Sequence, residues 1–107
     1  MHDDVLRVDV SHVDEVTWVM VKGEIDASTA LTLRATLEQL GIQRRIVVDM
    51  AGVEFMDSSG LKVLLTQKLQ MLESDGEISI CNPSDAIHRL LDVTGLREVL
   101  LEPEPSP

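Results

Sequence analysis

The stretch IVVDMAGVEFMDSSGLKVLL, residues 46–65, decides the fold of this chain. Its first five residues form a short apolar run with β-branched side chains, which is typical of a strand covered on both faces. Its end opens a second pattern, in which leucines recur at the spacing of an amphipathic helix: Leu61, Leu64, Leu65, Leu69 and Leu72. The polar segment Asp57-Ser58-Ser59-Gly60 is therefore predicted to start a helix that follows a buried strand.

The start of a helix offers two roles to a serine at position 58. The first N–H groups of a helix have no intrahelical partners, and the helix dipole favours negative charge there. Ser58 can act as part of an ordinary helix cap, or it can carry a phosphate held by the same amides. A phosphate would add about −1.5 to −2 units of charge. Asp57 likewise has two interpretations, as the cap residue or as a group that orients the acceptor hydroxyl.

The residues before this stretch predict a hairpin and a helix. Residues 5–10 alternate apolar and polar side chains, residues 11–15 form a polar turn, and residues 16–21 are more apolar, which favours two antiparallel strands. Gly23 is expected to break the second strand. The next helix has one apolar face and ends at Gly41; this face carries Ala30, Leu33, Leu37 and Leu40.

The residues after it predict a strand, a helix and a short last strand. The helix that begins near Ser58 should end at about residue 74, before a strand at 78–81. Asn82 is the expected N-cap of a third helix with Pro83 at its first position, and Gly95 should end that helix. Residues 97–101 are predicted as a strand, and residues 102–107, with proline at alternate positions, as a disordered tail.

This order, β-β-α-β-α-β-α-β, predicts one α/β domain over residues 1–101, in which helices pack on a mixed sheet. The core should be aliphatic, because Trp18 and Phe55 are the only aromatic residues among 107. A net charge of −10 argues against nucleic acid or an anionic membrane as the main partner and favours a basic protein surface.

The sequence also predicts a cytoplasmic protein. Cys81 is the only cysteine, which suits a reducing compartment, and its apolar surroundings suggest a buried, inert thiol. No N-terminal stretch resembles a signal peptide, and no apolar run approaches the ~20 residues that a membrane span needs.

The chain is predicted not to be an enzyme. None of the histidines, His2, His12 and His88, has an evident link to Ser58, and no glycine-rich phosphate-binding loop is present. Three acids within residues 46–65, at positions 49, 54 and 57, match no metal-binding loop pattern. We therefore expect neither a cofactor nor a metal.

Residues 49–61 closely resemble the signature of bacterial anti-sigma factor antagonists, which are single-domain members of the STAS family. Two weaker motifs agree in order and spacing. Residues 23–26 (Gly-Glu-Ile-Asp) resemble the family's first turn, and residues 82–84 (Asn-Pro-Ser), with 94–96 (Thr-Gly-Leu), are similar to its third helical unit. The resemblance covers about residues 5–101. Many members continue into a further C-terminal helix, which we expect to be missing here.

The resemblance implies a partner-switching mechanism in bacterial stress response and transcription regulation. The unphosphorylated chain would bind an anti-sigma factor that is also a serine kinase, which then releases its sigma factor. Phosphorylation of Ser58 would end that binding, and a serine phosphatase would restore it. Ser59 is the alternative acceptor, since the sequence separates the two serines only weakly.

Partner contacts are expected from Asp26, Asp57, Ser58, Ser59, Gly60 and Lys62. Asp26 matches a position at which the family presents an acid to the kinase, although it is equally suited to capping a helix. Gly60 would let the partner approach closely. The family more often has a small residue at position 62, where Lys62 would pair with the phosphate, narrow the choice of kinase, or simply be solvated.

Two other functions stay open. A STAS domain of this kind can serve as a regulatory subunit of a lipid-transport ATPase or as part of a stress-signalling assembly. In this alternative function, the chain would not be controlled by phosphorylation. A small nucleotide-binding or hydrolytic protein belongs to a different class, and no sequence feature supports it.

Overall fold

The computed structural model describes residues 6–102 and shows an α/β fold. Over these residues one sheet contains four strands in the order β1-β2-β3-β4. β1 runs antiparallel to β2, and β2, β3 and β4 are mutually parallel, so the sheet is mixed as predicted. The elements are, in chain order, β1 (Arg7–Val13), β2 (Val16–Ile25), α1 (Ala30–Leu40), β3 (Arg45–Met56), α2 (Ser58–Leu72), β4 (Glu77–Cys81), α3 (Asp85–Thr94) and α4 (Arg97–Leu100).

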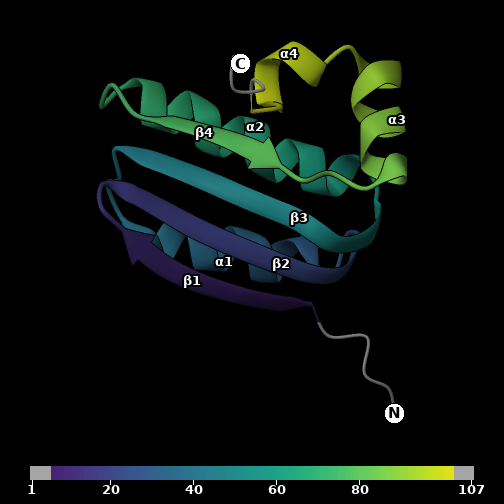
Figure 1. Ribbon diagram of the computed structural model, residues 1–107, viewed down its shortest axis with the longest axis horizontal. Helices are drawn as coiled ribbons and strands as arrows, with labels where there is room; N and C mark the ends of the chain where they lie inside the picture. Colours follow the sequence, from purple (N-terminus) through teal and green to yellow (C-terminus); the bar gives the residue numbers. More distant parts are fainter. Residues whose placement is uncertain (1–5, 103–107) are drawn as a thin grey trace.

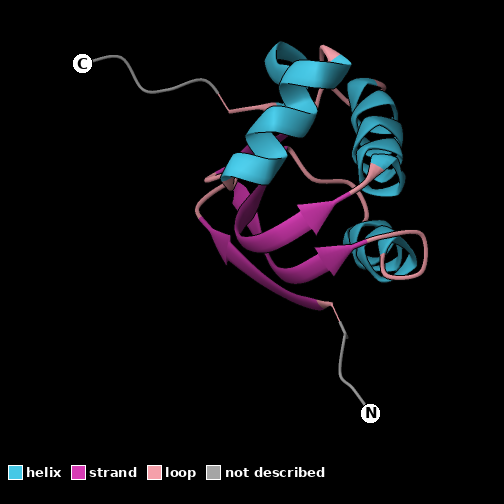
Figure 2. Ribbon diagram, turned by 90° about the vertical axis from the view of Figure 1, so that its right-hand side faces the viewer, coloured by secondary structure: helices cyan, strands magenta, loops and turns pink. Residues whose placement is uncertain are grey.

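The helices lie on one face of the sheet, across the end of its parallel strands, and beside its last strand. Figure 1 shows α1 and α2 behind the sheet, α3 across the end at which the parallel strands finish, and α4 above β4. The turned view in Figure 2 places α1 and α2 together on one side of the strands. The space between these layers is filled by aliphatic side chains that are fully buried, among them Val19, Leu33, Val48, Leu64 and Ile80. The predicted aliphatic core is confirmed.

β1, β2 and β3 are each longer than predicted. β1 continues to Val13, so only Asp14 and Glu15 are left for the turn, and Asp14 has a positive φ of 57°. β3 continues from Met50 to Met56 because it keeps pairing with β2 as far as Ile25. The expectation that Gly23 breaks β2 was wrong. Gly23 lies inside β2 with φ of 120°, at one of two register shifts between β2 and β3.

The third helix starts later than predicted. Its N-cap is Ser84, whose hydroxyl accepts a hydrogen bond from the N–H of Ile87, so Pro83 precedes the helix. Asn82 instead has a positive φ of 52° and forms the turn that follows β4. The prediction of Gly95 as the helix end is confirmed, because Gly95 occupies the left-handed region that suits a C-terminal glycine.

Residues 97–101 form a short helix and a single bridge in place of the predicted strand. Arg97–Leu100 is α4, and only Leu101 pairs with a strand residue, Ile80. Glu102, assigned to the tail by the sequence pattern, is held in place. Its N–H donates to the carbonyl of Ile80 at 2.7 Å, and its carboxylate accepts from Arg45 and Ser79. The rest of the predicted tail, 103–107, lies outside the described residues.

Among the described helices, none is both long and apolar enough to cross a membrane.

Candidate partner-docking site

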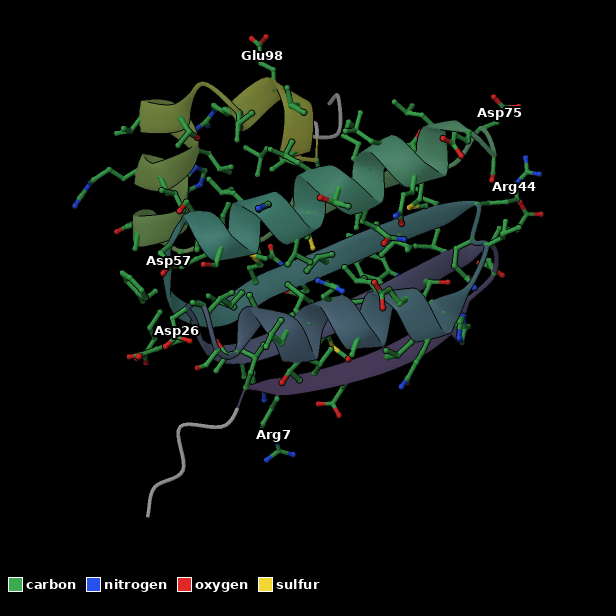
Figure 3. The ribbon with its side chains drawn as sticks, turned by 180° about the vertical axis from the view of Figure 1, so that it is seen from behind. Arg7, Asp26, Arg44, Asp57, Asp75 and Glu98 are labelled. Atoms are coloured by element: carbon green, nitrogen blue, oxygen red, sulfur yellow. The ribbon has the colours of Figure 1, made fainter. Side chains whose placement is uncertain are left out.

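Two loops meet where β2 and β3 end. Ile25 and Met56 are register partners at the ends of these parallel strands, so the residues that follow them, Asp26 and Asp57, lie at the same edge of the sheet. The main-chain N–H of Asp57 donates a hydrogen bond of 3.1 Å to the carbonyl of Ile25. Figure 3 shows both aspartates at this end of the molecule, beside the starts of α1 and α2. Two candidate residues from separate motifs thus belong to one surface.

Asp57 is the N-cap of α2. Its Oδ1 atom accepts a hydrogen bond of 2.8 Å from the N–H of Ser59, and its backbone is extended, as a cap residue requires. The capping interpretation of Asp57 is therefore what this structure shows. Ser58 is then the first residue of the helix, at the positive end of the helix dipole.

The two serines differ in access. The side chain of Ser58 is exposed and makes no hydrogen bond with the described residues. Ser59 is half-buried, its N–H is bound by Asp57, and it lines a groove between α1 and α2. Of the two serine side chains, that of Ser58 is the more accessible.

Gly60 is required by the packing of the chain itself. It is buried, and a Cβ built on it would lie 2.5 Å from the sulfur of Met56 and 2.8 Å from a methyl carbon of Ile25. These atoms belong to the ends of β2 and β3, so the missing side chain lets α2 sit closely on the strands. The close approach that the sequence predicted for a partner is made here by the chain's own residues.

Asp26 organises the loop between β2 and α1. Its Oδ1 atom accepts hydrogen bonds from the N–H groups of Ser28 and Thr29, both at 3.0 Å, and from the Ser28 hydroxyl at 2.8 Å. The bond from the Thr29 amide, followed by that from the Ser28 hydroxyl, holds the pKa of this carboxyl below its ordinary value. Asp26 therefore shapes the loop with one oxygen, and its other oxygen, Oδ2, accepts no hydrogen bond from the described residues.

Lys62 lies four residues after Ser58 in α2, on the same side of the helix. It is exposed, and no carboxylate among the described residues lies within ion-pair distance of its ammonium group. It also lines the groove between α1 and α2. Lys62 is thus close to the phosphorylation candidate without being neutralised by the rest of the fold.

Two residues of this surface have apolar side chains whose exposure the sequence did not reveal. Phe55 is 47% exposed and is the register partner of Glu24, so an aromatic ring and an acid stand side by side near Asp57. Leu31, 61% exposed, projects from α1 beside the core residue Ala30. Leu31 lies outside the apolar face of α1. This position was the one feature of the sequence from which its exposure could have been predicted.

Cys81 is half-buried at the end of β4, so the expectation of a buried thiol was wrong. Burial, with the nearby charges of Asp49 and Glu102, raises the pKa of this thiol to about 11. The thiol is protonated at neutral pH, which agrees with the predicted lack of reactivity.

Comparison with known proteins identifies the family. The family model described as STAS domain matches residues 7–106, and the chain belongs to that family. Two similar proteins are the anti-sigma F factor antagonist of Paenibacillus polymyxa, 34% identical over 99 residues that make up 89% of this chain and 84% of the relative, and the anti-sigma-B factor antagonist of Listeria monocytogenes, 33% identical over 94 residues (86% and 79%).

Solved structures show the same fold. An anti-sigma factor antagonist from Mycobacterium paratuberculosis superimposes with a TM-score of 0.84 at 29% identity, covering 96% of this chain and 90% of the other. The unphosphorylated form of the anti-sigma factor antagonist SpoIIAA gives 0.78 at 20% identity, covering 92% and 89%. The similarity to SpoIIAA supports the fold alone.

Proposed function

We propose that this chain is an anti-sigma factor antagonist controlled by phosphorylation of Ser58. Unphosphorylated, it binds an anti-sigma factor that is also a serine kinase, and this frees the sigma factor. After the kinase phosphorylates Ser58 the complex separates, and a serine phosphatase returns the chain to its binding form. The chain is then a binding protein and a kinase substrate, and the chemistry belongs to its partners.

The observation that carries this proposal is the exposure of Ser58 at the start of α2, next to Asp57 and across from Asp26. The relatives that match over most of the chain are named as antagonists of anti-sigma F and anti-sigma-B factors. A partner that docks here meets two carboxylates and the Ser58 hydroxyl, so the partner surface should be basic at this point.

A phosphate on Ser58 acts by charge and by bulk within that interface. It places about −1.5 to −2 units of charge at a surface that already holds two carboxylates. A loss of about 3 kcal/mol in binding free energy weakens affinity more than a hundredfold. Repulsion and the cost of desolvating a dianion supply an effect of that size when the phosphate lies inside the interface.

The first test is intact mass, with site mapping, of the protein from its native cells under phosphatase inhibition. We expect one phosphate, on Ser58. The second test measures affinity for each serine-kinase anti-sigma factor encoded in the source genome. Wild type should bind one of them tightly, and Ser58→Asp should bind it at least a hundredfold less well.

Ser11→Asp is the matched control, because Ser11 is an exposed serine of β1 that pairs with Trp18, near the end of β2 that lies away from Ile25. It adds the same charge outside the docking site and should leave affinity unchanged. Tight binding by Ser58→Asp, or an absence of phosphate under every growth condition, would contradict the proposal and favour a constitutive partner such as a transport complex.

A further inference from the structure

A groove between α1 and α2 begins at the docking site and runs along both helices. Its volume is about 410 Å³, and Ser59 and Lys62 are among its lining residues, so it is continuous with the surface around Ser58. A second hollow of about 240 Å³ follows it along the helices and shares Gln67, Gln70 and Glu38 with the first. The groove is therefore longer than the docking site itself.

Gln67 is a largely buried residue whose polar side chain lines this groove. It is only 9% exposed, lines both hollows, and makes no hydrogen bond with the described residues. Its amide atoms still reach solvent, because the one buried side-chain nitrogen or oxygen without a hydrogen bond among the described residues is the Nε of Arg45. The carboxamide is thus available to a group that enters the groove.

The walls of the groove combine apolar and basic side chains. Leu31 from α1 and Val63 from α2 contribute apolar surface, and Leu31 is 61% exposed although it lies on a regular helix. Arg34 from α1 and Lys62 from α2 bring two cations to a chain of net charge −10. Arg34 is paired with Glu38 at 3.1 Å, so the uncompensated charge of the groove is that of Lys62.

We infer that this groove is a second docking element for the same anti-sigma factor, and that it receives a partner segment carrying an apolar side chain next to a carboxylate. The apolar side chain packs on Leu31 and Val63, the carboxylate pairs with Lys62, and a polar group bonds to Gln67. This inference rests on the proposed function.

The charges of the docking site and the groove fix the orientation in which a partner can bind. The end of the site at Asp26 and Asp57 is negative, whereas the groove beyond Ser59 is positive at Lys62. A matching partner must present a basic group to the first and an acidic group to the second, about one helical turn away. A partner with the opposite order meets like charges at both points, so the groove selects among related anti-sigma factors.

The test uses the full chain and the anti-sigma factor that binds the wild type. We expect Leu31→Ser, Gln67→Leu and Lys62→Glu each to weaken binding by about tenfold or more. Gln67→Leu should not lower the melting temperature, because the amide makes no hydrogen bond in the free chain and leucine has a similar volume. Loss of affinity in a variant that is as stable as wild type cannot come from misfolding.

The substitutions of Leu31 and Lys62 each have a control outside the groove. Leu69→Ser removes a leucine of α2 that is 66% exposed but does not line the groove, and Arg89→Glu reverses an exposed cation on α3. Both controls should bind within twofold of wild type. Wild-type affinity in all three groove variants, while Ser58→Asp still fails to bind, would overturn this inference and leave the proposed function intact. Failure of the wild-type chain to bind any anti-sigma factor would overturn both.

Discussion

The main-chain N–H of Asp57 donates a 3.1 Å hydrogen bond to the carbonyl oxygen of Ile25, and this bond ties the start of α2 to the end of β2. It extends the parallel pairing of β2 with β3 by one more residue, to the point at which both chains turn into loops. The two acids of the docking site are consequently held by main-chain geometry, and their spacing does not depend on any contact between their side chains.

Asp26 should contribute stability that depends on pH. Its folded-state pKa is lowered by the amide of Thr29 and the hydroxyl of Ser28, so the ionised form is favoured by folding. That contribution is present above the unfolded-state pKa and is lost as pH falls through the folded-state value. In urea unfolding, Asp26→Ala should be less stable than wild type at pH 7, and the difference should vanish in acid.

The control for this experiment is Glu98→Ala. Glu98 points away from the body of the molecule, and its carboxylate accepts no hydrogen bond among the described residues. Its removal should leave the acid dependence of wild type in place. A difference between wild type and Asp26→Ala that stays constant with pH would show that the carboxylate charge plays no part.

Gly60→Ala should destabilise the fold although alanine is the better helix former. Alanine would gain about 1 kcal/mol of helix propensity. Its Cβ would meet Met56 and Ile25 at 2.5–2.8 Å, and crowding of this kind typically costs about 1–3 kcal/mol. Thermal and urea unfolding should therefore show a net loss, whereas Thr66→Ala, at an exposed position of α2, should be neutral or slightly stabilising. Equal stability of Gly60→Ala and wild type would mean that Met56 and Ile25 can move aside without a loss in the free energy of unfolding.

Cys81 should react slowly with alkylating reagents. With a pKa of about 11 the thiol holds about a hundredfold less thiolate at pH 8 than a cysteine with the ordinary value of 9.0. Iodoacetamide should accordingly modify the folded chain about a hundredfold more slowly than the urea-unfolded chain. Because folding raises this pKa, the associated stability is complete below pH 9 and declines as pH rises toward 11. Equal rates in the folded and unfolded chains would contradict the raised pKa.

Ser84→Ala should cost about 1 kcal/mol, since it removes the N-cap of α3. Asn82→Gly should have little effect, because glycine adopts the positive φ of that turn without strain. Urea unfolding of the two variants measures both effects. A larger loss in Asn82→Gly than in Ser84→Ala would return the cap to Asn82.

Sequence alone predicted the features that repeat over several residues. The aliphatic faces of α1 and α2 each span three turns, so their periodicity identified the helices and their buried sides. The strand pattern of residues 46–50 was equally clear, but β3 continues through residues 51–56, where Gly52 and Glu54 interrupt the apolar run. That extension depends on pairing with β2, which is a tertiary contact.

Short segments were predicted less well for a physical reason. Residues 97–101 include Val99 and two leucines, and five residues hold too little periodicity to separate a strand from one helical turn. The position of a cap depends on backbone angles, so the sequence pattern placed the cap of α3 at Asn82, two residues before Ser84, where the structure has it. The groove was missed because it joins Leu31 and Gln67 from helices that are distant in sequence.

A docking site that is fixed by main-chain hydrogen bonds can change its side chains without changing its shape. The bond between Asp57 and Ile25 and the close packing at Gly60 fix the shape of the site. Leu31, Lys62 and Gln67 line the adjoining groove and take no part in that bond or that packing. Duplicated copies of such a gene can therefore diverge in partner choice by a few surface substitutions while each protein still folds. Parallel signalling circuits built on one fold can be insulated from one another in this way within a single cell.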